Sequence, residues 1–378
     1  MRRLEIETLE ELDQLLDSNA DLTGAVFQSL DLTGHGPALR GAALHHNVLL
    51  GCTTSPEVLA LFEDPIIFPQ LPALPFDPFR GALYSPDELL GGYEIGDGPS
   101  YGSTVDGRCY QHFVDNDHAG SEEVMVTLAR RLHDHGISDA LQEFLRGRKV
   151  VAIMGGHSLG RDDPMYLEVA RLAGDLVRAG FLPTSGGGPG AMEATHLGAW
   201  FAERPDDELR DAVGILATAP KYDPRDPWLD TAFTVAERYP LPSIDGSRSL
   251  GIPTWHYGHE PPARFATDIA KYFANSVREE GLLAIAHHGV VFAPGSAGTI
   301  QEIFQDAAQN HYESFGMASP MVFLGEEYWT VRKPVYPLMK VLAEGRPYAR
   351  WLSITDSRGT VMDRLRAFDA TLARGEAP

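Results

Sequence analysis

The sequence predicts an α/β protein with a doubly wound parallel sheet in residues 147–378, preceded by a smaller mixed N-terminal region in residues 1–146. Two observations predict this class. From residue 148 onward, short apolar runs alternate with segments of helical pattern, and glycine-rich turns directly follow three of the runs. A chain of 378 residues is also long enough for two domains, since single cores rarely grow beyond about 250–300 residues.

The expected strands are apolar runs, which are typical of strands buried on both faces of a parallel sheet. They are Lys149–Met154, Phe181–Ser185, Ala212–Thr218, Gly289–Ala293, Pro320–Leu324 and Trp351–Thr355. The helices expected between them are Pro164–Ala179, Ala191–Arg204, Pro262–Ala286, Thr299–Tyr312, Val335–Ala343 and Gly359–Ala373. An insertion of about residues 219–262 interrupts the alternation. Because ligands of such sheets bind at the carboxyl ends of the strands, the glycine-rich turns are expected in one site.

The N-terminal region shows no clear α/β alternation, and its residues do not indicate a function. Residues 1–16 predict an amphipathic helix, and residues 22–52 weakly resemble a parallel ladder with too few turns to count as a repeat. The proline-rich residues 64–79 exclude a regular helix or a central strand. Residues 121–146 predict two helices that are split near Gly136.

Composition and charge exclude several classes of function. The formal net charge of −22 argues against nucleic-acid binding, which needs a broad basic surface, although a helix N-terminus can still hold one small phosphate. No apolar stretch reaches the roughly 18 residues of a membrane span, so no membrane partner is expected. Only Cys52 and Cys109 are present, and neither a metal-ligand spacing nor a secretory signal is apparent. The chain is therefore expected to be cytoplasmic and to hold no metal.

A run of glycines follows the second expected strand. It comprises Gly186, Gly187, Gly188 and Gly190, and Met192 lies in the helix start that follows. Consecutive glycines cost conformational entropy, so a packed domain retains them where no Cβ fits. A helix start beside them offers free N–H groups and a positive dipole end to an anion. The turn matches neither the dinucleotide nor the ATP-binding pattern. We interpret it as a phosphate site, with a tight strand–helix junction as the alternative.

A shorter turn follows the first expected strand and contains Gly155, Gly156 and Ser158. The glycines allow the backbone to approach a ligand, and the Ser158 hydroxyl can donate a hydrogen bond to a phosphate or a ribose. Glycine pairs also follow many strands that bind nothing, so ligand contact stays open. His157 is interpreted as a loop histidine rather than a general acid.

The third turn contains Gly295, Ser296, Gly298 and Thr299 and leads to Glu302. Thr299 and Glu302 have the spacing of a capping box, in which the glutamate reaches back to the helix N-cap. A carboxylate beside two other glycine turns can equally hold a ribose hydroxyl or offset a developing positive charge. The residues alone leave both interpretations open.

Three basic residues recur at seven-residue intervals on the expected helix Pro262–Ala286. They are Arg264, Lys271 and Arg278, which would share one face, and we expect the first two to be solvated. Arg278 is the best candidate for binding a substrate, since its helix leads into the strand that carries the third turn. No lysine lies beside a glycine turn in the sequence, which argues against a pyridoxal phosphate enzyme, and no cofactor is expected.

Together these motifs resemble the LOG family of Rossmann-like nucleotide-binding proteins, which are often mislabelled lysine decarboxylases. The resemblance covers about residues 148–312, through GGHSLGRDDPMY, SGGGPGAME, PGSAGTIQE and the helix that carries Arg278. It implies hydrolysis of the N-glycosidic bond of nucleoside 5′-monophosphates to free base and ribose 5-phosphate. It also implies a homodimer or a larger homo-oligomer.

The resemblance assigns catalytic roles to Glu302 and Arg278. It assigns phosphate binding to Gly187, Gly188, Gly190, Gly295, Gly298 and Thr299. Ser296 stands where the family has a glycine, and Glu279 stands where the family usually has a lysine. The alternative function is therefore a non-catalytic nucleotide-binding sensor or carrier module.

Overall fold

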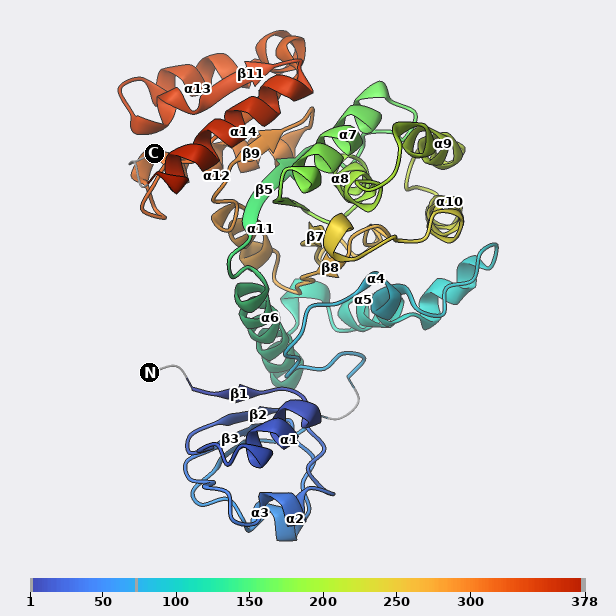
Figure 1. Ribbon diagram of the computed structural model, residues 1–378. Coiled ribbons are helices and arrows are strands. Elements are labelled where there is room, and N and C mark those ends of the chain that lie inside the picture. Colours follow the sequence, from blue (N-terminus) through green and yellow to red (C-terminus); the bar gives the residue numbers. More distant parts are fainter. Residues whose placement is uncertain (1–2, 72–73, 375–378) are drawn as a thin grey trace. The chain divides into compact units, whose positions relative to one another are not determined.

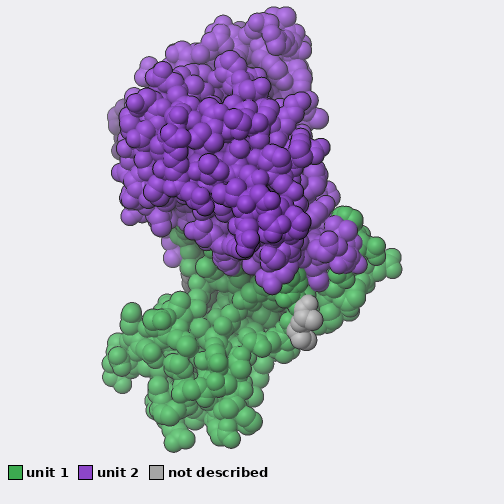
Figure 2. Space-filling model, turned by 90° about the vertical axis from the view of Figure 1, so that its right-hand side faces the viewer, with its two compact units in different colours: residues 1–83, 116–144 green, residues 84–115, 145–378 purple. Residues whose placement is uncertain are grey.

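The computed structural model describes residues 3–71 and 74–374, which divide into two compact units (Figure 2). The N-terminal unit comprises residues 1–83 and 116–144, and the C-terminal unit comprises residues 84–115 and 145–378. Residues 84–115 thus cluster with the C-terminal unit, although the sequence places them in the N-terminal region.

The N-terminal unit is built on a four-stranded parallel sheet whose strands follow one another in chain order (Figure 1). The strands are β1 (Glu5–Ile6), β2 (Val26–Gln28), β3 (Val48–Leu50) and β4 (Ile66–Phe68), and the first three are each followed by a helix, α1 (Leu9–Asp17), α2 (Gly36–Leu39) or α3 (Pro56–Leu59). The strands start about 20 residues apart, as in solenoid repeats. Apolar side chains from successive turns form one buried core, including Ile6, Phe27 and Leu49.

Two N-terminal expectations are corrected by this arrangement. The single opening helix is instead β1 followed by α1, because Thr8 caps α1 by accepting a hydrogen bond from the Glu11 N–H at 3.1 Å. The ladder-like pattern of residues 22–52 corresponds to successive turns of the solenoid. The proline-rich residues 64–79 contain β4, which lies at the edge of the sheet, as expected for a segment that cannot form a central strand. Residues 72–73 lie outside the described residues.

The helix α6 (Val124–Phe144) runs through Gly136 without a break, so the predicted split is wrong. A Cβ at Gly136 would overlap the backbone carbonyl of Arg80, and close packing of another segment therefore explains the glycine. Neither α6 nor any other helix in the described part of the chain has the length and apolar character needed to cross a membrane.

The C-terminal unit contains a seven-stranded parallel sheet in the order β11-β10-β9-β5-β6-β7-β8. The strands are β5 (Lys149–Met154), β6 (Phe181–Ser185), β7 (Leu250–Gly251), β8 (Asp268–Ile269), β9 (Val290–Phe292), β10 (Met321–Leu324) and β11 (Leu352–Thr355). From β5 the chain adds β6, β7 and β8 on one side, and from β9 it adds β10 and β11 on the other side. The doubly wound α/β class is confirmed, and the topological switch point lies between β5 and β9.

Two groups of helices cover the sheet (Figure 1). One group is α7 (Pro164–Arg178), α8 (Ala191–Trp200) and α14 (Arg358–Ala373), and the other is α11 (Asn275–Ala284), α12 (Ala297–Tyr312) and α13 (Val335–Ala343). The unit also contains α4 (Pro86–Leu90), α5 (Val105–Asp115), α9 (Asp206–Leu216) and α10 (Arg225–Arg238). Short 3₁₀ or π turns are η1 (Gly98–Ser103), η3 (Asp245–Ser247), η4 (Tyr328–Arg332) and η5 (Pro347–Arg350), with η2 (His118–Gly120) in the N-terminal unit.

The expected strand Ala212–Thr218 is wrong, because most of this segment belongs to helix α9. Three acidic residues occupy the first turn of α9, where they favour the positive end of the helix dipole. Leu209, Ala212 and Leu216 are buried at helical spacing. The apolar run that suggested a strand therefore belongs mostly to the second half of an amphipathic helix, whose acidic first turn precedes the run.

The expected helix Pro262–Ala286 is also wrong over its first half, which contains β8 and extended backbone; the helix begins only at Asn275. The supposed basic face does not exist. Lys271 is fully buried in an ion pair with Asp106, which also accepts a hydrogen bond from Trp255 Nε1 at 2.9 Å. Arg264 pairs with Asp87 at 2.8 Å. Partners supplied by residues 84–115 stabilise these charges, and helical periodicity could not reveal them.

Candidate functional site

The three glycine turns meet at the switch point, each at the carboxyl end of its strand. The first turn follows β5, the second follows β6 and the third follows β9. The Gly156 N–H donates to the Pro294 carbonyl at 3.1 Å, and the Ala191 N–H donates to the Gly156 carbonyl at 3.2 Å. The first turn therefore binds both of the others through its backbone.

Packing within the protein accounts for the glycines of the second turn. Gly187 and Gly190 both have φ of +71°, a conformation that favours glycine. A Cβ on Gly187 would lie 2.8 Å from Pro253, a Cβ on Gly190 would overlap the Gly156 carbonyl, and a Cβ on Gly186 would overlap the Arg278 guanidinium. The whole turn Gly186–Gly190 is buried. A tight strand–helix junction therefore explains this turn without any ligand.

The third turn is more open. Helix α12 begins at Ala297 with Ser296 as its N-cap residue, so Thr299 lies inside the helix rather than at its cap. The capping box proposed for Thr299 and Glu302 is therefore wrong, because the preceding residues are already helical. Ser296, Ala297 and Gly298 are exposed, and their helix end presents N–H groups that have no partner within the helix.

A lysine that sequence analysis missed lies on this turn. Lys333 Nζ donates to the Ser296 hydroxyl at 2.8 Å and to the Gly295 carbonyl at 3.1 Å. Tyr328, at the start of η4, donates to the same carbonyl at 2.5 Å. Lys333 is 37 residues from Ser296, and no local pattern links them. No lysine is next to a glycine turn in the sequence, but Lys333 lies against the third turn in space. The argument against pyridoxal phosphate therefore no longer holds.

The two glycines of the third turn have different surroundings. A Cβ on Gly295 would overlap the Thr299 hydroxyl, whereas a Cβ on Gly298 would meet no atom within 4 Å. Glycine inside a helix costs roughly 0.5–1 kcal/mol relative to alanine. Packing therefore requires Gly295, while Gly298 weakens its helix without a packing reason, as is expected where a ligand approaches the backbone.

Gly298→Ala is expected to raise the free energy of unfolding by roughly 0.5–1 kcal/mol. It is also expected to weaken, about tenfold or more, binding of the nucleoside monophosphate that the LOG resemblance implies. Thermal unfolding and calorimetric titration measure the two effects. The matched control is Gly214→Ala on α9, where a Cβ also meets no atom within 4 Å, and it should stabilise without changing affinity. Unchanged affinity in Gly298→Ala would remove this glycine from the binding site.

Glu302 lies one turn further along α12 and is partly buried. Its carboxylate has no hydrogen bond or ion pair with any residue that the structure describes. Burial raises its pKa from 4.5 to about 7, Arg278 opposes this rise and Glu279 adds to it. A carboxyl group that titrates near neutral pH can accept or donate a proton under physiological conditions.

Arg278 lies on α11, as expected for its segment of the predicted helix. Its Nε donates to the Ile252 carbonyl at 2.8 Å and its Nη2 to the Gly186 carbonyl at 3.5 Å. The guanidinium therefore holds the second turn in place. It also influences the Glu302 pKa, so the structure brings the two predicted catalytic residues into one electrostatic environment.

A cavity of about 440 Å³ adjoins the first and second turns. Its lining includes His157, Ser158, Gly190, Lys221 and Tyr222. The His157 and Tyr222 rings meet edge to face with centroids 6.0 Å apart. The predicted insertion thus contributes an aromatic ring and a cation to the cavity, two residues that the sequence did not single out.

A buried ion pair holds this cavity in place. Arg161 Nε donates to Glu193 at 2.8 Å, and the Tyr166 hydroxyl donates to the same carboxylate at 2.8 Å. The Arg161 guanidinium also stacks over Trp228 at 4.5 Å and donates to the Trp228 carbonyl at 3.1 Å. This network joins the first turn to α7, α8 and α10.

One group of potential metal ligands is found among the described residues, and it lies in the N-terminal unit. It consists of Glu5, Glu7 and Glu143. None of these residues belongs to the glycine turns.

Comparison with known proteins identifies no family. No family model matches the chain, and no curated protein matches it. Solved structures that match part of the chain include a molybdenum cofactor binding protein from Rippkaea orientalis, with 13% identity over 58% of this chain and 96% of that one, at a TM-score of 0.36. A Moco carrier protein from Chlamydomonas reinhardtii has 13% identity over 59% of this chain and 99% of that one, also at 0.36. Similarity at this level does not indicate a shared ligand.

Proposed function

We propose that the C-terminal unit binds a nucleoside 5′-monophosphate at the switch point between β5 and β9. The observation that carries this proposal is the open start of α12, where Gly298 leaves room for a ligand and Lys333 adds a positive charge. A helix of 16 residues directs its dipole and its free N–H groups at an anion bound there. The Ser296 hydroxyl supplies a further polar contact.

The surroundings of the turns favour a nucleoside over a bare phosphate. The cavity of about 440 Å³ lies within the size range of small-ligand pockets. Tyr222 offers an aromatic face for a base, and His157 and Ser158 offer hydrogen-bonding groups. The resemblance of the glycine turns to the LOG family supports the same ligand class.

Glu302 favours a second and finer proposal, which is hydrolysis of the N-glycosidic bond. Water would add to C1′ and the base would leave with a proton, through an oxocarbenium-like state. The unpaired carboxylate of Glu302 can take the proton of the water and offset the positive charge on the sugar. Arg278 keeps the second turn in position through its hydrogen bonds to the Ile252 and Gly186 carbonyls. A non-catalytic sensor or carrier would use the same pocket without this step.

A panel of AMP, GMP, CMP and UMP tests both proposals. Calorimetric titration measures binding, and chromatography of the same samples measures free base and ribose 5-phosphate. Saturable binding with product release supports hydrolysis, and saturable binding without release supports the sensor or carrier. Folded protein that binds none of the four would overturn the nucleotide proposal.

Lys333→Met is expected to weaken binding of the preferred monophosphate roughly tenfold to a hundredfold, because it removes a charged hydrogen-bond donor from the third turn. Lys340→Met on α13 is the control, since that lysine is exposed and lies within another helix. Equal losses in the two variants would indicate a general effect of charge rather than a phosphate contact at the turn.

A further inference from the structure

The C-terminal unit has a second cavity of about 440 Å³, which shares no lining residue with the one beside the glycine turns. Four arginines and one carboxylate line it. They are Arg171, Arg178, Arg204, Arg358 and Asp206. We refer to this site as the arginine cavity. Each of the four arginines has a carboxylate partner. Arg171 pairs with Glu168 and Asp206, Arg178 and Arg358 pair with Asp175, and Arg204 pairs with Glu208.

Small residues form the floor of the arginine cavity, where α7 and α8 come into contact. A Cβ on Gly198 would overlap the backbone carbonyl of Ala170, and a Cβ on Gly174 would lie 3.1 Å from the Gly198 carbonyl. Phe201 and Leu209 add apolar lining. The floor is therefore made of backbone and small side chains, and the long arginine side chains surround it.

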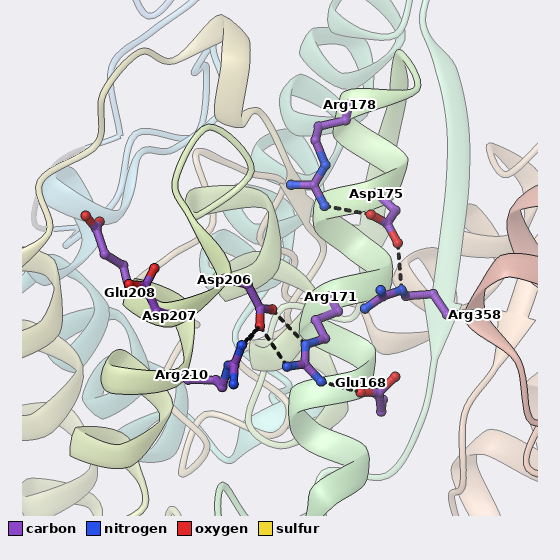
Figure 3. Close-up of polar contacts among 9 residues, drawn as sticks. All are labelled: Glu168, Arg171, Asp175, Arg178, Asp206, Asp207, Glu208, Arg210 and Arg358. Carbon is purple, nitrogen blue, oxygen red and sulfur yellow. Dashed lines mark hydrogen bonds and ion pairs between the residues drawn. The ribbon is translucent and has the colours of Figure 1, made fainter.

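Two of the carboxylates near the cavity, Asp175 and Asp206, each contact two guanidinium groups (Figure 3). Asp175 accepts from Arg178 Nη2 at 2.6 Å and lies 2.7 Å from Arg358 Nε. These two arginines come from α7 and α14, so helices distant in the sequence present their charges to one anionic group. The position of the Asp175 carboxylate shows that Arg178 and Arg358 can hold an anionic group between them.

The second shared carboxylate is Asp206, at the start of α9. It accepts two hydrogen bonds from Arg171, at 2.8 and 2.9 Å, and one from Arg210 Nε at 2.8 Å (Figure 3). Arg171 lines the cavity, whereas Arg210 does not. Arg210 therefore belongs to the same network and provides a matched control for the cavity itself.

Most guanidinium donors at the cavity have partners, since Arg204 donates to Glu208 at 2.8 Å and to the Pro240 carbonyl at 2.6 Å. Two arginines keep donors that are not used. The Nε atom of Arg204 is buried and has no hydrogen-bond partner in the described part of the chain. Arg358 contacts Asp175 through Nε, and its two Nη atoms have no partner among residues 3–71 and 74–374. Buried donors are nearly always satisfied in folded proteins, so the unpaired Nε requires an explanation.

A purely structural network does not explain this arrangement. Exposed ion pairs contribute little to stability, and ties between helices do not require four arginines around an open space. The planar guanidinium fork matches the oxygens of a phosphate, and the volume matches that of a small-ligand pocket. We propose that the arginine cavity binds a small phosphorylated metabolite, whose phosphate takes the free donors of Arg204 and Arg358.

Titration of the full chain with inorganic pyrophosphate tests the proposal, with sodium chloride added to keep the ionic strength constant. The experiment uses Lys333→Met protein, so that binding at the third turn is weakened. This protein is expected to retain saturable binding. Adding Arg358→Met should lower the affinity about tenfold or more, whereas adding Arg210→Met should change it less than about twofold.

Three outcomes would overturn the proposal: no saturable binding in the Lys333→Met protein, no loss with Arg358→Met, or an equal loss with Arg210→Met. Thermal unfolding of each variant checks that the fold is intact. If Arg358→Met lowers the unfolding temperature, Arg358→Lys replaces it, since lysine keeps the charge and loses the fork. Retained affinity in the lysine variant counts against the proposed phosphate contact. Nucleotide binding at the switch point does not affect these outcomes.

Discussion

Glu302→Gln is expected to lower the release of free base at least about a hundredfold and, at pH 8, to make the fold more stable. The first effect follows because the carboxamide can neither take a proton from water nor offset positive charge on the sugar. The second follows because glutamine keeps the shape of glutamate without a charge that is costly to bury. A site residue that destabilises its own fold is a signature of function rather than of packing.

The pH dependence of this gain follows from the pKa of Glu302. Burial raises that pKa from 4.5 to about 7, so folding favours the protonated carboxyl. The resulting stability is fully present below pH 4.5 and is lost as the pH rises to 7. The advantage of Glu302→Gln should therefore grow across this window and level off above it, at about 2–3 kcal/mol or less. Thermal unfolding at several pH values measures it.

Asp306→Asn is the matched control, since Asp306 lies one turn further along the same helix. Burial raises the pKa of Asp306 to about 8, but its carboxyl faces a different cavity, lined by His287 and Asn310. This variant should also gain stability at alkaline pH, with base release within about twofold of the unchanged protein. If Glu302→Gln instead loses about 1 kcal/mol and keeps its turnover, Glu302 is only structural.

Glu193→Ala is expected to cost about 3–5 kcal/mol of stability, because it leaves the Arg161 charge buried without its partner. Both side chains of the pair are buried, and Tyr166 would lose its acceptor as well. A loss of this size lowers the unfolding temperature by roughly 10 °C. Differential scanning calorimetry at pH 7 measures the change.

Glu168→Ala provides the comparison. Glu168 pairs with Arg171 at 2.7 Å, but its side chain is 46% exposed, and such pairs contribute about 0–1 kcal/mol. Similar small losses in both variants would contradict the prediction. They would indicate that Trp228 and the backbone carbonyls around Arg161 compensate its charge without Glu193.

Much of the C-terminal fold could be predicted because its signals are local. Strands such as β5 and β6 are apolar runs flanked by glycine-containing turns, and helix α13 has the predicted bounds. The errors arise where contacts distant in the sequence decide the structure. Burial of Lys271 against Asp106 turns an expected solvated helix face into extended backbone, and no periodicity shows such a partner.

The same contrast between local signals and distant contacts applies to the residues of the candidate site. The glycine turns and Glu302 could be recognised from short motifs, and the parallel topology brings the turns together. Lys333 and Tyr222 could not, because each reaches the site from a segment whose own pattern is unremarkable. Packing also separates the turns in a way that the motifs do not. The buried second turn is explained by packing, while the exposed Gly298 is not.

The solenoid of the N-terminal unit has a consequence for how its length can change. Each turn buries its apolar residues mainly against the next, so the unit is close to a one-dimensional stack. Removing one complete turn, from the start of β2 to the residue before β3, leaves the remaining turns able to dock in the same register. A deletion of half that length would place core positions at the surface. The number of turns in this unit can therefore change only in whole steps if the shared core is to be kept.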